Sequence, residues 1–132
     1  MDFKNAKELL DFCQKLNCPI SDIMKQRECT LAETSLEDIY AKMDHALSIM
    51  RESASSPIQE PKKSIGGLIG GEARLADLHR ARGAAICGSV LSRAITYSMA
   101  VLETNTSMGL IVAAPTAGSS GIVPGLLLAL QE

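Results

Sequence analysis

The sequence has no tryptophan and few other aromatic residues, which limits how its core can be built. Phe, Trp and Tyr make up 3% of its 132 residues, whereas hydrophobic residues of all kinds make up 46%. A core of Leu, Ile, Met and Ala suits closely packed helices better than a β-sandwich. The length is sufficient for one modest core. We therefore expect a mainly α fold, with a single helical domain carrying glycine-rich loops.

A strong charge of one sign and a long hydrophobic run are also absent. The formal net charge is −2, which gives no general attraction to nucleic acids or anionic membranes. The chain begins with polar residues rather than an apolar leader. The longest late apolar run, residues 122–130, is interrupted by Pro124 and Gly125 and is far shorter than the ~20 residues that span a bilayer. We expect a cytoplasmic chain that binds neither nucleic acid nor membrane.

Short metal-binding spacings are the third absence. The four cysteines of the sequence are Cys13, Cys18, Cys29 and Cys87. None of them has the C-x-x-C spacing that holds zinc or an iron–sulfur cluster. Reduced and buried thiols are the simpler interpretation in a cytoplasmic chain. We therefore expect no metal ligand among these residues.

The two histidines and a group of basic residues have structural explanations. His45 is predicted to lie beside Asp44 on the solvated face of a long helix. The basic group consists of Arg74, His79, Arg80 and Arg82. Its cations complement the C-terminal end of the dipole of a short predicted helix over 72–82, and contact with an acidic partner chain is the alternative. No residue is a convincing general base, so we assign no catalytic residue.

Apolar residues at helical spacing account for most of the chain. The predicted helices cover residues 6–16, 21–30, 36–53, 72–82 and 89–103, with a last helix opened by Pro124. Asn17 and Pro19 end the first helix, and Ser21 caps the second. Thr34 with Glu37 predicts a capping box before the third.

Between the third and fourth helices the composition changes. Residues 55–63 hold two prolines and show no periodicity, which is typical of a mobile linker. We expect this linker to separate an N-terminal helical cap, residues 1–54, from the functional part, residues 64–132. The last helix stops without a C-cap, which suggests a truncated or divided polypeptide.

The stretch over residues 105–125 is rich in glycine, proline and small hydroxyl residues. Ala114 precedes Pro115 and is therefore biased to an extended conformation. Gly118 can adopt a positive φ, and Ser119 or Ser120 can cap the helix that follows. Together these features predict a tight turn leading into a helix N-terminus.

Backbone N–H groups and hydroxyls converge at such a turn, beside the positive end of the helix dipole, and favour a bound carboxylate or phosphate. The alternative is a plain loop that joins two buried segments. The apolar runs at 110–114 and 126–130 are predicted to be buried on either side of the turn. A polar turn held between buried supports favours the interpretation as a site.

A second glycine-rich stretch, SIGGLIGG at residues 64–71, pairs glycines with apolar residues. Its backbone can approach another group closely on one side. That group is either a second backbone packed against it or a ligand, and the residues alone favour packing.

Two of these stretches carry a resemblance to a known family. The run NTSMGLIVAAPTAGSSGIVPG at 105–125 and the run SIGGLIGGEA at 64–73 are similar to two motifs of the alpha chain of iron–sulfur-dependent L-serine dehydratases. The resemblance runs along the whole chain, but only as the N-terminal part of that alpha chain. It implies the loss of water from L-serine to give aminoacrylate, which becomes pyruvate and ammonia, a step in amino-acid degradation and gluconeogenesis.

The resemblance also implies a substrate site in this chain. The implied substrate-binding residues are Ser64, Gly66, Gly67, Ser107, Thr116, Ala117, Gly118 and Ser119. Within this set, the Thr116 hydroxyl and the backbone of residues 117–119 would hold the substrate carboxylate.

The family's [4Fe–4S] cluster is held by cysteines that lie beyond Glu132, so its ligands are absent from this chain. In two-chain members a separate beta chain carries a Ser-His motif and can supply the base. We therefore expect L-serine and a beta chain as partners, with homo-oligomerisation left open, and no activity from the isolated chain. The alternative is a non-catalytic helical module, an inactive fragment or paralogue that binds a small carboxylate or a partner chain.

Overall fold

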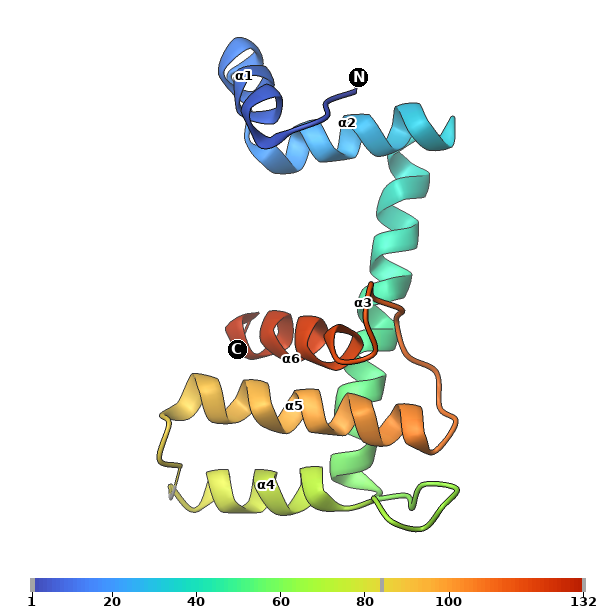
Figure 1. Cartoon of the computed structure of the whole chain (residues 1–132), viewed down its shortest axis with the longest axis vertical. Helices are drawn as coiled ribbons and strands as arrows, with labels where there is room; N and C mark the ends of the chain where they lie inside the picture. The colour runs from blue at the N-terminus through green and yellow to red at the C-terminus, as the bar shows by residue number, and fades with distance from the viewer. Residues whose placement is uncertain (1, 84, 132) are drawn as a thin grey trace. The chain divides into compact units, whose positions relative to one another are not determined.

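The structure is a computed structural model that describes residues 2–83 and 85–131. Its ordered elements are α1 (Ala6–Leu16), α2 (Ile20–Ala32), α3 (Leu36–Gln59), α4 (Glu72–Ala81), α5 (Ser89–Thr106) and α6 (Ser119–Gln131). No strand occurs within the described residues, so the expected mainly α fold is confirmed. The chain divides into two compact units, residues 1–45 and 46–132, and the boundary lies inside α3 (Figure 1).

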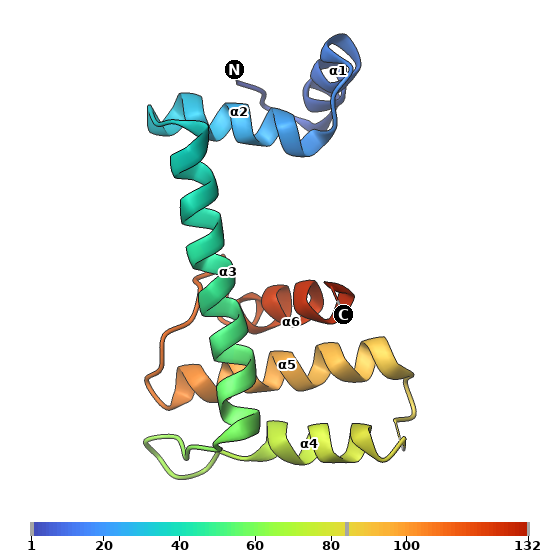
Figure 2. The ribbon, with the colours of Figure 1, turned by 180° about the vertical axis from the view of Figure 1, so that it is seen from behind.

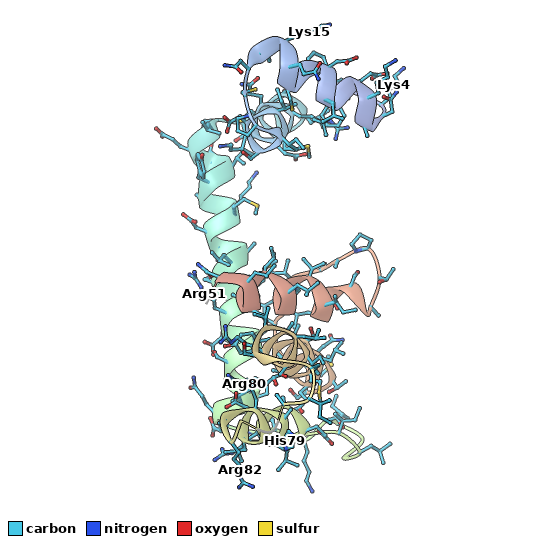
Figure 3. All side chains as sticks on the ribbon, turned by 90° about the vertical axis from the view of Figure 1, so that its left-hand side faces the viewer. Lys4, Lys15, Arg51, His79, Arg80 and Arg82 are labelled. Atoms are coloured by element: carbon cyan, nitrogen blue, oxygen red, sulfur yellow. The ribbon has the colours of Figure 1, made fainter. Side chains whose placement is uncertain are left out.

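The first unit contains α1 and α2, which contact each other. The side chain of Asn5 caps α1 by accepting a hydrogen bond from the N–H of Glu8 at 3.0 Å. The helix ends at Asn17, which has the left-handed conformation with φ 48°, as predicted. Figure 3 shows Lys4 and Lys15 near the two ends of this helix.

The predicted start and end of the second helix are wrong. The extended residue before α2 is Pro19, whose pyrrolidine ring fixes φ at −70°, and the helix begins at the next residue, so Ser21 lies inside it. The helix continues to Ala32 and ends at the left-handed residue Glu33, beyond the expected end near Thr30.

The capping box of α3 is displaced by one residue from the prediction. Asp38 N–H donates to Ser35 Oγ at 3.1 Å, and Ser35 N–H donates to Asp38 Oδ2 at 3.3 Å. Thr34 instead donates its hydroxyl proton to the same carboxylate at 2.9 Å. Hydrogen bonds from Ser35 and then Thr34 hold the pKa of Asp38 below its usual range. The reciprocal pair is therefore Ser35 with Asp38 rather than Thr34 with Glu37.

In the second unit, α3 continues through the first five residues of the predicted linker, to Gln59. Pro57 lies inside this last turn and has no N–H to donate to the carbonyl of Ser53, four residues earlier. The hydroxyl of Thr104 on α5 donates to that carbonyl at 2.8 Å instead. A tertiary hydrogen bond thus satisfies the acceptor that proline leaves free, and the helix persists where composition predicts a linker. The predicted domain limits at 54 and 63 stay a prediction.

The helices α4, α5 and α6 form a layer with α5 in the middle, as Figures 1 and 2 show from opposite sides. Contacts join α5 to both neighbours. A small buried cluster of Ala54, Val101 and Leu128 draws on α3, α5 and α6, and Leu47, Tyr97 and Ile111 pack against it. This layer places the ends of its helices, and hence the glycine-rich turns, at fixed positions.

The apolar supports predicted around the Thr116 turn are only partly buried. Residues 110–114 are neither strand nor helix but an irregular connection from α5 to α6. Leu110 is 69% exposed, and Leu127 and Leu130 on α6 are 52% and 72% exposed. The prediction of two buried arms is therefore wrong for these side chains, because the neighbouring helices within the described residues cover only one face of α6.

The prediction of buried thiols is also wrong. Cys13, Cys18 and Cys29 are half-buried, and Cys87 is exposed. Each lies at or near a helix end, where a side chain has few neighbours to cover it. All four are free thiols, as expected. Among the described residues, no helix has the length and apolar character needed to cross a bilayer.

Candidate functional site

The Thr116 turn is a reciprocal cap at the start of α6. Ser119 N–H donates to Thr116 Oγ1 at 3.1 Å, and Thr116 N–H donates to Ser119 Oγ at 2.9 Å. The two hydroxyl oxygens also lie 2.9 Å apart, within hydrogen-bonding distance. Thr116, rather than Ser119 or Ser120, is therefore the capping residue, because its side chain reaches the N–H three residues on.

The turn leaves an open polar surface beside Gly118. A Cβ atom added at Gly118 would meet nothing within 4 Å. The N–H groups of Ala117 and Gly118 find no acceptor among the described residues, as is usual in the first turn of a helix. Gly118 can adopt a positive φ but does not do so here, because it lies in the first turn of the helix that Thr116 caps. Two unpaired N–H groups thus lie at the positive end of the α6 dipole.

The left-handed residue of this stretch is Met108 instead, with φ 63°. It ends α5 by donating its N–H to Asn105 O at 3.1 Å, while Gly109 N–H donates to Thr104 O at 2.8 Å. The hydroxyl of Ser107 donates to Thr104 O at 3.1 Å. A Cβ at Gly109 would lie 2.5 Å from Thr104 Cγ2. Gly109 therefore serves close packing, and Ser107 is part of the helix end.

The loop over residues 64–71 closes on itself. Ser64 N–H donates to Ile69 O at 2.7 Å, and Ile69 N–H donates to Ser64 Oγ at 3.2 Å. At Gly70 an added Cβ would lie 2.8 Å from the Cα of Lys63, so this glycine packs against backbone. At Gly66 and Gly67 an added Cβ would meet nothing within 4 Å. Both interpretations of the loop therefore apply, packing at its end and open space at its tip.

Glu103 is a residue of this region that the sequence interpretation missed. It is 3% exposed, and its carboxylate accepts hydrogen bonds from the N–H of Ala73 at 2.7 Å and of Gly71 at 3.0 Å. These N–H groups open α4, so a buried negative charge lies at the positive end of that helix. An acidic residue in the last turn of a helix, just before the run of small residues at 105–125, was the available signal.

Glu72 adds a second carboxylate at the same helix start. Its Oε2 accepts the N–H of Gly70 at 2.7 Å. The hydrogen bond from its own backbone N–H, followed by that of Gly70, holds the pKa of Glu72 below its usual range. The exit of the 64–71 loop is therefore fixed by Glu103 from α5 and by Glu72 from α4.

The predicted site residues lie near one end of the helical layer. Ile65 N–H donates to Thr106 O at 3.4 Å, which brings the Ser64 loop to the end of α5 beside Ser107. Figure 1 shows the connection over residues 107–118 starting from the same end. None of the hydrogen bonds among the described residues joins the Thr116 turn to the Ser64 loop. The structure thus brings Ser64 and Ser107 together and leaves Thr116 as a separate turn on that side.

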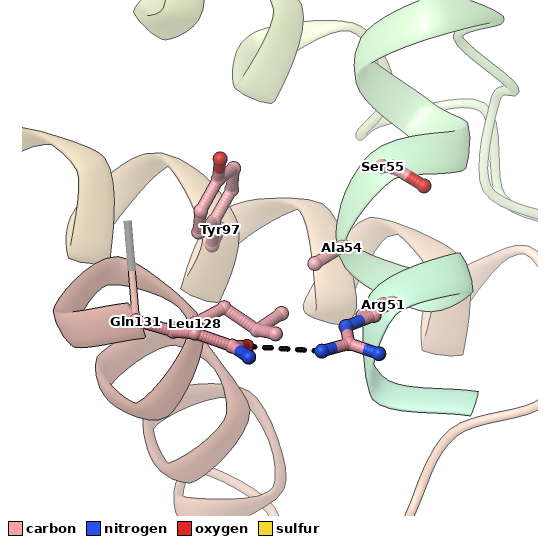
Figure 4. A pocket seen from close by; sticks show the side chains of 6 residues that line it. All are labelled: Arg51, Ala54, Ser55, Tyr97, Leu128 and Gln131. Carbon is pink, nitrogen blue, oxygen red and sulfur yellow. Dashed lines mark hydrogen bonds between the residues drawn. The ribbon is translucent and has the colours of Figure 1, made fainter. Parts of the chain in front are cut away.

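Two cavities of the second unit have similar volumes. One, of about 310 Å³, includes Ser107, Met108 and Lys62 in its lining together with Glu103. The other, of about 350 Å³, is lined by Arg51, Ala54, Ser55, Tyr97, Leu128 and Gln131 (Figure 4). In it Arg51 donates to Gln131 Oε1 at 3.2 Å. Only the first cavity contains a predicted site residue, Ser107.

The histidines and the basic group have the surroundings expected of surface residues. His45 and His79 are both exposed. Arg80 forms an ion pair with Asp77 at 2.7 Å, and Arg74 donates to Gln59 O at 2.9 Å. Figure 3 shows the basic side chains at the end of α4. Within residues 2–83 and 85–131, no group of three or more His, Cys, Asp or Glu side chains can hold a metal ion.

Comparison with known proteins finds similarity along nearly the whole chain. Residues 15–132 match the family model described as serine dehydratase alpha chain. The chain is 39% identical over 130 residues to a probable L-serine dehydratase alpha chain of Bacillus subtilis, covering 98% of this chain and 43% of that protein. It is 35% identical over 127 residues to an L-serine dehydratase alpha chain of Peptoniphilus asaccharolyticus, covering 96% and 44%.

A third relative is an L-serine dehydratase of Helicobacter pylori, 31% identical over 134 residues, covering 96% of this chain and 28% of that protein. The chain therefore spans less than half the length of these relatives. No solved structure matches it.

Proposed function

Because this chain belongs to the serine dehydratase alpha chain family, which its residues 15–132 match, we propose that it takes part in converting L-serine into pyruvate and ammonia. The two relatives named as alpha chains support the proposal. The reaction is assigned to the assembly in which the chain works, because those relatives are more than twice as long. We place this assembly in the cytoplasm.

The proposed role of this chain is to bind the substrate carboxylate. The observation that carries it is the open turn at Gly118, where the N–H groups of Ala117 and Gly118 have no acceptor among the described residues. A carboxylate there would receive two backbone hydrogen bonds and the favourable field of the α6 dipole. Thr116 and Ser119 hold each other, so their part is to fix the two N–H groups in place.

The Ser64 loop and Ser107 form the proposed second part of the site. The open tip at Gly66 and Gly67 leaves room for a ligand or for another chain. Ser107 lines the cavity of about 310 Å³ at the end of α5. We propose that these residues contact the rest of the substrate once the Thr116 turn holds its carboxylate.

The proposal includes a [4Fe–4S] cluster and a beta chain as further components, as the resemblance implies. The described residues do not fit a cluster site. We therefore assign no residue of this chain to the cluster and derive no step through it. The chain's own contribution is to bind and orient.

The test is to purify a tagged copy of the chain under anaerobic conditions from the cells that encode it, with its bound partners. The purified assembly should form pyruvate from L-serine, and the tagged chain stripped of partners should not. The control is an assembly purified through an unrelated tagged protein. Absence of L-serine-dependent pyruvate formation in every assembly that contains the chain would overturn the proposal.

A Gly118→Ala variant tests the carboxylate role. The added methyl group would meet no described residue within 4 Å, so the melting temperature should be unchanged or slightly raised. If the substrate carboxylate approaches here, KM for L-serine should rise by about tenfold or more, since a hydrogen bond to a charged group contributes about 1.5–3 kcal/mol. Ser21→Ala on the exposed surface of α2 is the control, because it lies outside both parts of the proposed site. Unchanged kinetics in Gly118→Ala would remove the carboxylate from this turn.

A further inference from the structure

Two thiols are brought together at the end of α1. Cys18 N–H donates to Cys13 O at 3.1 Å, and Asn17 N–H donates to Gln14 O at 3.4 Å. Asn17 between them is left-handed, with φ 48°. This pair of hydrogen bonds around a left-handed residue is the Schellman motif, in which the side chains of the first and last residues frequently contact each other. Here both of those residues are cysteines.

The backbone hydrogen bond limits how far apart the two residues can lie. With ordinary bond lengths, an N···O distance of 3.1 Å between Cys18 and Cys13 keeps the two Cα atoms within about 7 Å. Disulfides need Cα atoms about 4.4–6.8 Å apart. The separation set by this hydrogen bond is therefore compatible with a disulfide across the intact helix end.

We propose that Cys13 and Cys18 are a reversible thiol–disulfide site that forms within the folded helix end. Both thiols are half-buried and free, so a small oxidant can reach them. Partial burial, and then the neighbouring charges of Cys13 and Asp22, raise the pKa of the Cys18 thiol above its usual range. The effect of Cys13 on the pKa of Cys18 agrees with their proximity. The raised pKa lowers the fraction of thiolate at neutral pH, so it slows thiol–disulfide exchange without preventing it.

The oxidant is a low-molecular-weight disulfide such as oxidised glutathione. One cysteine thiolate attacks a sulfur of this disulfide and expels one glutathione thiolate. The second cysteine thiolate attacks the protein sulfur of the mixed disulfide, forms the bond between Cys13 and Cys18, and expels the other. The two protein thiol protons end on the two glutathione molecules, so one disulfide is exchanged for another.

The end of α2 provides an internal control that shares the left-handed residue and the longer-range of the two hydrogen bonds, although its cap N–H donates to Cys29 O rather than also to Thr30 O. Glu33 is left-handed there, and Thr34 N–H donates to Cys29 O at 3.1 Å. Cys29 and Thr34 therefore occupy the positions that Cys13 and Cys18 occupy on α1. Thr34 has no thiol, so Cys29 lacks a partner in its own motif.

The first experiment maps disulfides in the full chain with Cys87→Ser, which removes the exposed thiol. The protein is incubated with oxidised and reduced glutathione at about pH 8.5, where much of an ordinary thiol is ionised. The remaining thiols are then alkylated. Trypsin cleaves after Lys15, so a disulfide joins peptides 8–15 and 16–25. We expect these linked peptides and an alkylated Cys29; free Cys13 and Cys18, or a bond to Cys29, would overturn the proposal.

The second experiment separates the folded motif from the closeness of the two cysteines in sequence. The same exchange in concentrated urea gives the equilibrium constant for the unfolded chain. The folded chain should favour the disulfide by at least about tenfold over the unfolded chain, because the motif already holds the thiols together. Equal constants would show that the fold contributes nothing and would sink the proposal.

A transplanted pair gives the matching positive test. Thr34→Cys in a chain with Cys13→Ser, Cys18→Ser and Cys87→Ser should form a disulfide with Cys29 under the same conditions. Failure of this pair, in a variant whose helix content is unchanged, would contradict the geometric basis of the proposal. None of these measurements depends on L-serine, so their outcome is independent of the proposed function.

Discussion

Glycines of two kinds occur within a few residues of one another at the start of α6. Gly121 and Gly125 face α5, where an added Cβ would lie 3.0 Å from Ser98 O and 2.8 Å from Ala94 O, respectively. Gly118, one turn earlier, faces open space. The same contrast separates Gly70 from Gly66 in the other glycine-rich loop. A run of glycines in a motif can thus serve packing at one end and leave space for a ligand at the other.

The difference depends on what lies opposite each residue. On α6, residues 121 and 125 are one helical turn apart and point to the same neighbour. Because neither glycine has a side chain, α6 can approach the backbone of α5 closely. This contact fixes the position of the Thr116 turn. Gly118 precedes this contact, and none of the described residues fills the space next to it.

The largest effect should come from Gly125→Ala. The added methyl group would overlap Ser98 Oγ and lie 2.9 Å from the Ser98 backbone nitrogen. Because backbone atoms of a helix cannot move aside alone, we expect the free energy of unfolding to fall by about 2–3 kcal/mol. Thermal and urea unfolding measure this change.

Gly121→Ala is the graded comparison for that variant. Its nearest contacts are at 3.0 Å, to Leu102 Cγ and Ser98 O, and a flexible leucine side chain can move. We expect a smaller loss, about 1 kcal/mol. Equal stability of both variants and the wild-type chain would show that α6 does not depend on close contact with α5.

Glu103→Gln should lower the free energy of unfolding by weakening the packed end of the 64–71 loop. The carboxylate accepts two backbone N–H groups in a buried position, and an amide offers one oxygen and places an NH₂ group against the other donor. We expect a loss of about 1.5–3 kcal/mol, measured by urea unfolding. Glu52→Gln on the exposed surface of α3 is the control. A variant as stable as this control would contradict the anchoring role of Glu103.

Thr116→Val tests whether the open turn depends on its cap. The substitution keeps the shape of the side chain but removes the acceptor of Ser119 N–H. We expect the melting temperature to fall, corresponding to about 1 kcal/mol, the typical contribution of such a cap. An unchanged melting temperature would show that the Thr116 hydroxyl is free for a ligand, which would favour its direct contact with the substrate.

The smallest effect concerns Glu72 and depends on pH. Its folded pKa lies below the ordinary value of 4.5, so the folded state holds this proton less tightly than the unfolded state. The stabilisation is complete above 4.5 and is lost as the pH falls through the folded pKa. The stability difference between wild type and Glu72→Gln should therefore shrink on acidification. A stability difference that stays constant with pH would contradict a lowered pKa of Glu72 in the folded state.

Several features could be predicted because they depend on neighbours in the sequence. The bounds of α1 and the stop after Asn17 follow from apolar spacing and a residue that tolerates the left-handed conformation. The start of α5 at Ser89 and the end of α4 near Gly83 follow from similar signals. The two glycine motifs, read as a pair, also identified the family that residues 15–132 match.

Other features could not be predicted, because their partners lie far away along the chain. Pro57 stays in α3 since Thr104 satisfies the carbonyl of Ser53. Glu103 lies near the end of α5, but its carboxylate is buried against the start of α4. The N–H groups that it accepts there, from Gly71 and Ala73, come some thirty residues earlier in the sequence. Helical spacing marks Glu103 only as the polar end of α5.

The sequence by itself determined that this protein is helical, where most helices lie, and to which family it belongs. Only the tertiary structure decided which glycines at the start of α6 pack and which stays open, and that Glu103 anchors the glycine loop. The physical reason is range. Helix propensity, caps and periodicity act within about one turn of the chain, whereas packing space and buried hydrogen bonds are set by whichever distant residue the fold brings opposite.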